Sequence, residues 1–220
     1  MTAECYSIVV DERIDILDSS GEQTGRVAWK SEAHRLGLWH RCFHCWIVSP
    51  ETPSGGPYLF AQRRASGKET WPDRLDVTVA GHLGAGEGTL EGGLREIEEE
   101  LGLPVNPDEL IPLGTRSVES QIPAGLDREF HDVFLLFRPL SPEDLHLQKE
   151  EVAAIVRLRL QDVEALHEGE DISAEKWRDG ETSPTSVSLS EFVPGGDDYL
   201  PRTARAARDV LSGGRPGNHF

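Results

Sequence analysis

Three glutamates with helical spacing, Glu96, Glu99 and Glu100, are the residues of this sequence best placed to do chemistry. At positions i, i+3 and i+4 of a helix their carboxylates share one face, where like charges cost about 0.2–0.5 kcal/mol per pair. A divalent cation would remove that repulsion, and oxygen ligands suit Mg²⁺ or Mn²⁺, which bridge carboxylates to substrate phosphates. The spacing therefore predicts a metal site, whereas a run of glutamates taken alone is typical of a solvated helix face.

A glycine-rich loop precedes the glutamates and favours the metal site over the solvated face. Gly81, Gly84, Gly86 and Gly88 permit unusual backbone angles and let main-chain N–H groups approach an anion. Gly81 is accordingly a candidate substrate-binding residue. The loop also brings Glu87 toward the same helix as a further candidate metal ligand. It matches neither a Walker loop nor a G-x-G-x-x-G turn.

The helix that carries the glutamates is predicted from its apolar spacing and from its ends. Its apolar residues fall at i, i+4, i+7 and i+11 and form one stripe that must face a core: Leu90, Leu94, Ile97 and Leu101. Thr89 is the candidate N-cap, and Gly102 followed by Leu103 and Pro104 is typical of a C-terminus. Arg95 lies among the acids, and we expect it to orient one of them through a bidentate pair.

These residues also fill one longer signature. Gly81, Glu87, Arg95-Glu96-Ile97, Glu99-Glu100 and Gly102-Leu103 have the spacing G-x5-E-x7-R-E-U-x-E-E-x-G-U, where U is aliphatic. This is the full signature of the Nudix hydrolases, which the chain resembles at every fixed position. The resemblance implies an α/β/α sandwich around a mixed β-sheet, and attack by water on a phosphorus of a diphosphate linked to another group X.

The expected mechanism uses metal at Glu87, Glu96, Glu99 and Glu100 to neutralise the diphosphate oxygens and to lower the pKa of the attacking water. A carboxylate then takes the proton. Glu99 and the distal pair Glu150-Glu151 are the candidates, and the sequence does not choose between them.

Residues 30 to 160 resemble one branch of the superfamily, that of isopentenyl-diphosphate isomerase and its hydrolase-like relatives. The segments that carry this resemblance are Ala33-His34, Leu38-Trp39-His40, Arg63-Arg64-Ala65 with Lys68, Trp71-Pro72, Ala80-Gly81-His82 and Asp127-Arg128-Glu129. In the isomerases the matching histidines and acids bind a metal, which implies a second site at His34, His40, His82, Asp127 and Glu129. This mixed N/O set suits Zn²⁺ or Mn²⁺. Alternatively, His34 and His40 only form hydrogen bonds within the fold.

The match to the isomerases breaks at one position. An isomerase needs a cysteine before the Gly-His pair, and here that residue is Ala80, while the acids that isomerases usually lose are all present. We therefore expect a metal-dependent hydrolase; an isomerase and a non-catalytic, ligand-sensing Nudix domain are the alternatives. Arg64 and Lys68 match residues that contact the diphosphate in isomerases, and two nearby cations are also common at the end of a surface strand.

Composition limits the partners. The formal net charge of −17 opposes binding to a nucleic-acid backbone, and a metal-chelated small anion remains compatible. No signal peptide or membrane span is evident among the 220 residues, which favours the cytoplasm. The cysteines, Cys5, Cys42 and Cys45, do not indicate a disulfide framework, and Cys42 and Cys45 would point to opposite faces of a strand. A homodimer is left open.

The remaining pattern mixes strands and helices within a single domain. We expect a hairpin extension over 1–29, a core over 30–167, and an irregular segment over 168–196 that leads to a helix at 204–211 and a loose tail. Within the core we expect a turn-rich stretch at 50–57, helices over 30–35 and 162–167, and strands over 42–48, 58–62, 75–80, 110–118, 129–138 and 152–160. The identity of X is open: Trp39, Phe43 and Trp71 could stack on a base or belong to the core.

Overall fold

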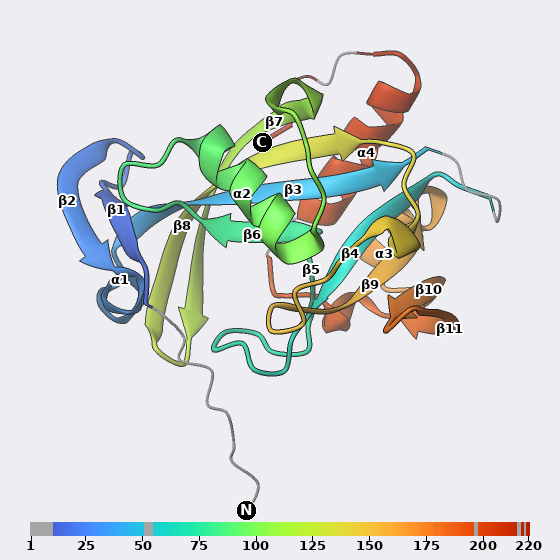
Figure 1. Cartoon of the computed structure of the whole chain (residues 1–220), viewed down its shortest axis with the longest axis horizontal. Helices are drawn as coiled ribbons and strands as arrows, with labels where there is room; N and C mark the ends of the chain where they lie inside the picture. The colour runs from blue at the N-terminus through green and yellow to red at the C-terminus, as the bar shows by residue number, and fades with distance from the viewer. Residues whose placement is uncertain (1–10, 51–54, 196–197, 215–216, 218) are drawn as a thin grey trace, which may run out of the picture.

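A mixed β-sheet forms the centre of the protein, with helix α2 on one face and helices α3 and α4 on the other (Figure 1). The computed structural model describes residues 11–50, 55–195, 198–214, 217 and 219–220. Cys5, the middle of the turn at 50–57 and parts of the tail lie outside these residues. The predicted α/β/α sandwich is confirmed.

The elements run in the following order. The strands are β1 (Arg13–Leu17), β2 (Gln23–Trp29), β3 (Trp39–Ser49), β4 (Tyr58–Arg64), β5 (Leu75–Asp76), β6 (Val79–His82), β7 (Leu110–Ile122), β8 (Gly125–Phe137), β9 (Val152–Arg159), β10 (Ile172–Arg178) and β11 (Glu181–Val187). The helices are α1 (Lys30–Leu36), α2 (Thr89–Leu101), α3 (Val163–His167) and α4 (Tyr199–Leu211), with short 3₁₀ turns that include η4 (Leu189–Glu191).

Strand β3 organises the sheet because it has partners on both sides. The main order is β11-β10-β9-β4-β3-β1-β2, and β6 and β8 also pair with β3. The pairing of β3 with β8 is parallel over ten residue pairs, whereas the other pairings between named strands are antiparallel. The sheet is therefore mixed, as predicted, and β3 lies between β6 and β8.

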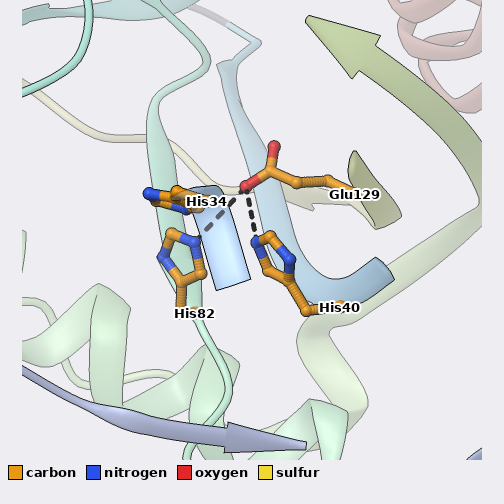
Figure 2. Close-up of side chains that lie close together, drawn as sticks. All are labelled: His34, His40, His82 and Glu129. Carbon is orange, nitrogen blue, oxygen red and sulfur yellow. Dashed lines mark ion pairs between the residues drawn. The ribbon is translucent and has the colours of Figure 1, made fainter. Parts of the chain in front are cut away.

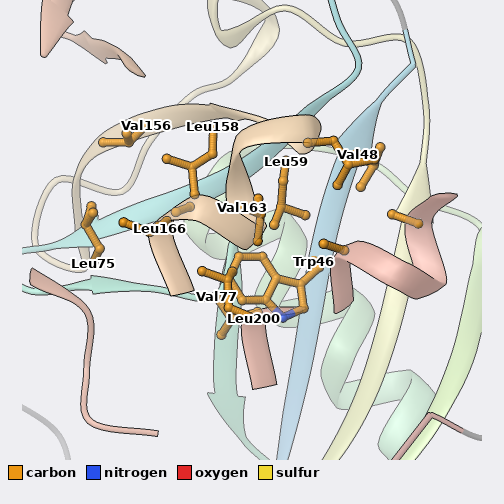
Figure 3. Packing of buried hydrophobic residues seen from close by; sticks show 14 of the residues in the cluster. Trp46, Val48, Leu59, Leu75, Val77, Val156, Leu158, Val163, Leu166 and Leu200 are labelled. Atoms are coloured by element: carbon orange, nitrogen blue, oxygen red, sulfur yellow. The ribbon is translucent and has the colours of Figure 1, made fainter. Parts of the chain in front are cut away.

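Alternate residues of β3 enter two different cores. Phe43 and Cys45 pack on the α2 side, whereas Trp46 and Val48 pack on the α3 and α4 side, where Figure 3 shows them beside residues such as Leu200. Side chains alternate between the faces of a strand, so Cys42 lies on the opposite face from Cys45, as the sequence predicts. Both thiols are free.

Helix α2 ends as predicted but begins differently. Gly102 adopts the left-handed conformation at φ 62° and closes the helix. The N-cap is Gly88, not Thr89, because the Thr89 hydroxyl donates instead to Asp132 Oδ2 at 3.0 Å. The prediction that Leu90 faces the core is also wrong, since 42% of this residue is exposed. Glycines fill the buried face near the start of the helix.

The C-terminal third is more regular than predicted. Residues 172–187 form the hairpin β10–β11, which extends the sheet beside β9 and corrects the expectation of an irregular segment. Its turn has φ 53° at Asp179 and φ 84° at Gly180, the geometry that an Asp-Gly pair favours between two strands. Helix α4 begins at Tyr199, five residues before the predicted start at 204.

The N-terminal hairpin is confirmed as β1 and β2, and it supports the glycine-rich loop. The Ala85 N–H donates to the carbonyl of Arg13 at 2.8 Å, and the Gly86 N–H donates to Asp15 Oδ2 at 2.9 Å. The predicted strand at 75–80 is instead two short strands, β5 and β6, with different partners. Among the described residues, no helix is both long enough and apolar enough to cross a membrane.

Candidate active site

Arg95 holds the acids of α2 and of the preceding loop together. Its Nε and Nη2 atoms donate to the two oxygens of Glu87 at 2.9 and 3.0 Å, a bidentate pair. Its Nη1 atom donates to Glu96 at 2.8 Å and to Glu99 at 3.0 Å. A further bond from Nη2 reaches the carbonyl of His82 at 3.2 Å, so Arg95 also ties α2 to β6. Glu87, the acid from the loop, is therefore its bidentate partner.

Two glycines allow α2 to lie close to the sheet. A Cβ atom on Gly81 would lie 2.1 Å from the Glu96 carboxyl carbon, and one on Gly93 would lie 2.2 Å from the ring of Phe43. Neither clash could be relieved without moving the helix or the carboxylate. Gly81 belongs to β6 rather than to a loop, and its missing side chain makes room for Glu96.

The loop N–H groups that were expected to approach an anion bind carboxylates of the protein itself. The Gly84 N–H donates to Glu87 Oε2 at 2.7 Å, and the Gly86 N–H donates to Asp15. Of the four loop glycines, Gly86 has a left-handed φ, 79°. The loop therefore fixes Glu87, which in turn fixes Arg95.

Two of the three candidate metal ligands on α2 are withdrawn from solvent. Glu100 is 4% exposed, and burial followed by the nearby Glu96 raises its pKa well above the ordinary value. Burial raises the pKa of Glu96 to about 7, although Arg95 opposes the shift. Glu99 has a side chain 53% exposed. Arg95 bonds Glu96, and Lys68 and Arg64 act on Glu100, yet the pKa of each carboxyl stays raised, so the donor set fits a divalent cation.

The distal acids and the two predicted phosphate contacts lie at one end of a cavity. Lys68 forms a short ion pair with Glu151, and Arg64 binds Asp76 Oδ2 at 3.1 Å and the Thr70 carbonyl. Both Lys68 and Glu151 influence the pKa of Glu100, which places them near α2. Glu150 is exposed. The structure thus brings Glu151, more than Glu150, toward the helix acids.

Three histidines and Glu129 converge from α1, β3, β6 and β8 (Figure 2), and Asp127 of β8 lies beside them. Glu129 Oε1 lies 3.5 Å from His40 Nε2 and 3.4 Å from His82 Nε2. Asp127 Oδ1 lies 3.6 Å from the Nε2 atoms of His34 and His40. One ligand atom from each histidine and one from Glu129 all lie within 4.8 Å of one another. All five residues implied by the isomerase resemblance are therefore together.

The chemistry of this histidine cluster also fits a cation. The Nε2 atoms of His34, His40 and His82 and the Oδ1 atom of Asp127 are buried without a hydrogen-bond partner among the described residues. The His40 Nδ1–H donates to the Leu38 carbonyl at 2.9 Å, so its Nε2 atom is the one that faces the acids. Burial lowers the pKa of His34 to about 4 and that of His82 to about 3, so these two rings are neutral. Burial also opposes the charge on His40, but Glu129 outweighs it and raises the pKa of that ring. Imidazole nitrogens together with carboxylate oxygens suit Zn²⁺ or Mn²⁺.

A cavity of about 1250 Å³ adjoins both groups of residues. The histidine cluster lines it through His34, His82, Asp127 and Glu129. Its lining also includes Arg64, Lys68, Glu150, Glu151 and Gly81. The α2 glutamates do not line it themselves, but Glu96 lies against Gly81, which does. The volume exceeds what a diphosphate alone would occupy.

The three aromatic residues that could stack on a base lie in different surroundings. Phe43 is fully buried in the core and stacks on Phe134 at 5.2 Å. Trp39 packs against Phe130 at 4.8 Å. Trp71 lines the cavity, and its φ of 50° is a strained value for a bulky residue. Among the three, Trp71 is the side chain placed to meet a ligand.

The far wall of the cavity comes from residues that carry no sequence signal. Arg116 of β7, Phe192, Pro194 and Tyr199 line it. The guanidinium of Arg116 lies 4.1 Å from the centre of the Tyr199 ring and donates to the Gly195 carbonyl at 2.5 Å. These contacts join β7 to the segment before α4, far away in the chain, and no local pattern predicts such a contact.

Comparison with known proteins agrees with the geometry. Residues 39–179 match the NUDIX domain model. The chain is 37% identical over 153 residues to an uncharacterised Nudix hydrolase of Clostridium acetobutylicum, an alignment that covers 70% of this chain and 72% of that protein. It is also 37% identical over 151 residues to Nudix hydrolase 3 of Arabidopsis thaliana, with 67% of this chain but 19% of that protein covered.

Similarity extends to isomerases and to a solved structure. An isopentenyl-diphosphate Delta-isomerase of Photorhabdus laumondii is 25% identical over 174 residues, which cover 76% of this chain and 94% of the isomerase. The crystal structure of a Deinococcus radiodurans protein, DR0079, superposes with a TM-score of 0.53 at 22% identity, and the match covers 72% of this chain and 91% of that one. At that identity the superposition supports the fold alone.

Proposed function

Because this chain belongs to the Nudix family and is a hydrolase of diphosphate bonds, we propose that it cleaves a small-molecule diphosphate linked to a group X at the cavity described above. The observation that carries the proposal is the burial of Glu96 and Glu100 beside that cavity, with raised pKa values and too little compensating positive charge. A divalent cation supplies what is missing.

Glu96 and Glu100 are the proposed core of the metal site. Bound Mg²⁺ or Mn²⁺ would supply charge neutralisation at the diphosphate and a lower pKa of the attacking water. Glu99 and Glu87 both accept hydrogen bonds from Arg95, so each can become a metal ligand only if its bond to Arg95 breaks. Arg95 therefore acts as a positioning residue: its bond to Glu96 at 2.8 Å sets the direction of that carboxylate over Gly81.

Glu151 is our choice of general base. It lines the cavity, whereas Glu99 does not, it is less exposed than Glu150, and its charge raises the pKa of Glu100. Its partner Lys68 is then freed to bind a diphosphate oxygen when substrate enters. Arg64, fixed by Asp76 and the Thr70 carbonyl, presents a second cation to the same group.

The histidine cluster is the proposed second metal site, for Zn²⁺ or Mn²⁺. Its support is the set of buried nitrogen and oxygen atoms that lack hydrogen-bond partners among the described residues. X would occupy the part of the cavity bounded by Trp71, Arg116 and Tyr199. That lining offers an aromatic face, a cation and a hydroxyl group, which favours a polar, ring-bearing X such as a nucleoside over a hydrocarbon chain.

The test is a panel of diphosphates assayed with Mg²⁺ or Mn²⁺, with products separated by chromatography. We expect nucleoside diphosphates and their conjugates to be hydrolysed faster than prenyl diphosphates. An absence of hydrolysis for every compound with either ion would overturn the proposal. Faster hydrolysis of the prenyl compounds would overturn only the assignment of X.

Isomerisation is the alternative activity, but Ala80 stands at the position of the cysteine that an isomerase needs. His44 faces Ala80 across the β3–β6 pair, where an isomerase would carry its cysteine. Cys42, on the same face, donates to Glu129 Oε1 at 3.0 Å, and burial raises the pKa of its thiol well above the ordinary value. We therefore expect no conversion of isopentenyl diphosphate into its allylic isomer. Detection of the isomer by proton NMR would contradict this.

A further inference from the structure

A line of four side chains runs from helix α4 to the histidine cluster. The Tyr199 hydroxyl lies 3.0 Å from His44 Nδ1. The rings of His44 and His131 stack with centroids 3.9 Å apart and planes 23° apart. His131 Nε2 lies 2.7 Å from Glu129 Oε2. This Tyr199–Glu129 line therefore ends on an acid of the proposed second metal site.

The sheet register explains why these side chains meet. Strands β3 and β8 are parallel, with Cys42 opposite His131, so His131 and His44 lie on the same face two residues apart in register. Arg116 of β7 is opposite His131 and extends over Tyr199. Tyr199 also meets the rings of Trp46 at 5.9 Å and Phe220 at 5.3 Å. The tyrosine is thus held by packing as well as by its hydroxyl.

The polarity of the hydrogen bonds fixes the direction of the Glu129 carboxylate. An ionised carboxylate only accepts, so His131 Nε2–H is the donor to Oε2. The other oxygen, Oε1, accepts from the Cys42 thiol and faces His40 and His82. Holding Oε2 against His131 therefore keeps Oε1 turned toward the point where the histidine nitrogens converge. Partners of this kind orient the ligands of a metal.

We propose that Tyr199, acting through His44 and His131, is a positioning residue for Glu129 and so sets the affinity of the histidine cluster for a transition metal. This inference rests on the proposed second metal site. It gives the C-terminal segment a role in that site, although Tyr199 lies beyond the matched NUDIX domain, which ends at residue 179. It also gives functions to His44 and His131, which the reaction does not otherwise use.

The experiment measures the affinity of purified protein for Zn²⁺ and Mn²⁺ by competition with a chromogenic chelator. The variant Tyr199→Phe keeps the ring, its packing and its contact with Arg116, and removes only the hydroxyl. We expect its Kd for the metal to rise about 10-fold, the lower end of the effect of losing an outer partner, and that of His131→Ala to rise by up to about 100-fold. Tyr58→Phe, the same change at a tyrosine buried elsewhere, should bind like the wild type.

A double-mutant cycle separates positioning from general loosening of the fold. In a Glu129→Gln background, Tyr199→Phe should have no further effect on metal affinity, because its target has already been changed. A full additional loss in that background would overturn the inference. So would wild-type affinity in Tyr199→Phe when His40→Ala has lost the metal. If His40→Ala and the wild type bind equally, the second metal site itself is absent and the inference falls with it.

Discussion

The α2 acids and the histidine cluster are two candidate metal sites built on neighbouring residues of β6, and they are electrostatically opposite. In the first, Arg95 already neutralises Glu87, Glu96 and Glu99 in part. In the second, four buried polar atoms face one another without a hydrogen-bond partner among the described residues. A metal at α2 must compete with a guanidinium, whereas a metal at the histidines completes a set of unsatisfied atoms.

This difference suggests a division of labour. An ion that competes with Arg95 is held less tightly and can arrive with a diphosphate, as Mg²⁺ does when it keeps its waters and bridges to phosphate. An ion held by imidazoles and carboxylates should stay bound when the protein is purified. We therefore propose that the metal at α2 exchanges with each substrate and that the metal at the histidine cluster is a resident metal, one that remains bound.

The largest expected effect is at Glu100. Replacement by Gln keeps its shape and its contact with Gln62 but removes the charge, so kcat for a hydrolysed diphosphate should fall by about 100-fold or more. Glu98→Gln, an exposed change on the same helix, is the matched control. Unchanged kcat in Glu100→Gln, measured at saturating Mg²⁺, would show that α2 is not the site that turns over.

The next effect concerns the resident metal. His40→Ala with His82→Ala removes two ligands, and the Zn²⁺ or Mn²⁺ content of purified protein should fall at least about 10-fold. The control is His146→Ala, an exposed histidine outside the cluster. The metal content of both proteins is measured by elemental analysis. Equal metal content would show that the histidine cluster holds no resident metal.

Gly81→Ala should affect the two sites unequally. The new Cβ would displace Glu96, so Mg²⁺-dependent kcat should fall about 10-fold. The metal content of the histidine cluster should persist, because His82 projects to the other face of β6. Gly88→Ala, with open space around its Cβ position and an ordinary φ of −76°, is the control. Equal losses at both sites would mean that they form one unit.

The smallest effect is a dependence on pH. With a pKa of about 7, Glu96 in the metal-free protein is protonated below neutrality, so Mg²⁺ affinity should fall by up to about 10-fold per pH unit below pH 7. Because the folded pKa is raised above 4.5, the stability that Glu96 contributes is full below about pH 4.5 and is lost as the pH rises through 7. Added Mg²⁺ should therefore raise Tm more at pH 8 than at pH 6. If Mg²⁺ raised Tm equally at pH 6 and pH 8, the assignment of Glu96 as the titrating metal ligand would be contradicted. It would also be contradicted if Glu96→Gln kept the full difference between the two pH values.

The sequence predicted correctly those helix ends and strands that depend only on neighbouring residues. The end of α2 at Gly102 needs only a residue that tolerates φ 62°, and the strands of the core follow from their apolar runs. The predicted N-cap was wrong because the Thr89 hydroxyl donates to Asp132 instead. The prediction that Leu90 is buried was wrong because Gly93, which has no side chain, is the residue that lies against Phe43 of the sheet. The hairpin at 172–187 was missed even though Asp179-Gly180 is a turn signal, because the surrounding polar composition obscured it.

The candidate site residues also differ in how far local sequence could predict them. The α2 acids are adjacent in sequence, so helical spacing suffices to group them. The five residues of the histidine cluster are spread over almost a hundred positions, and only resemblance to a family could group them. Arg116 and Tyr199 meet through sheet register and the packing of α4, and neither spacing nor resemblance pointed to them.

The part of the cavity lined by residues of 189–195 and 199–201 has a consequence for how the protein can vary. These residues lie after the matched domain ends at 179, whereas the acids of α2 lie well inside it. An insertion, deletion or substitution in this late segment would reshape the part of the cavity proposed for X without changing the carboxylates of α2 that we propose as metal ligands. Proteins that share the signature helix could therefore differ in substrate through changes in this segment alone. A change at Tyr199 should also alter the affinity of the histidine cluster for its metal.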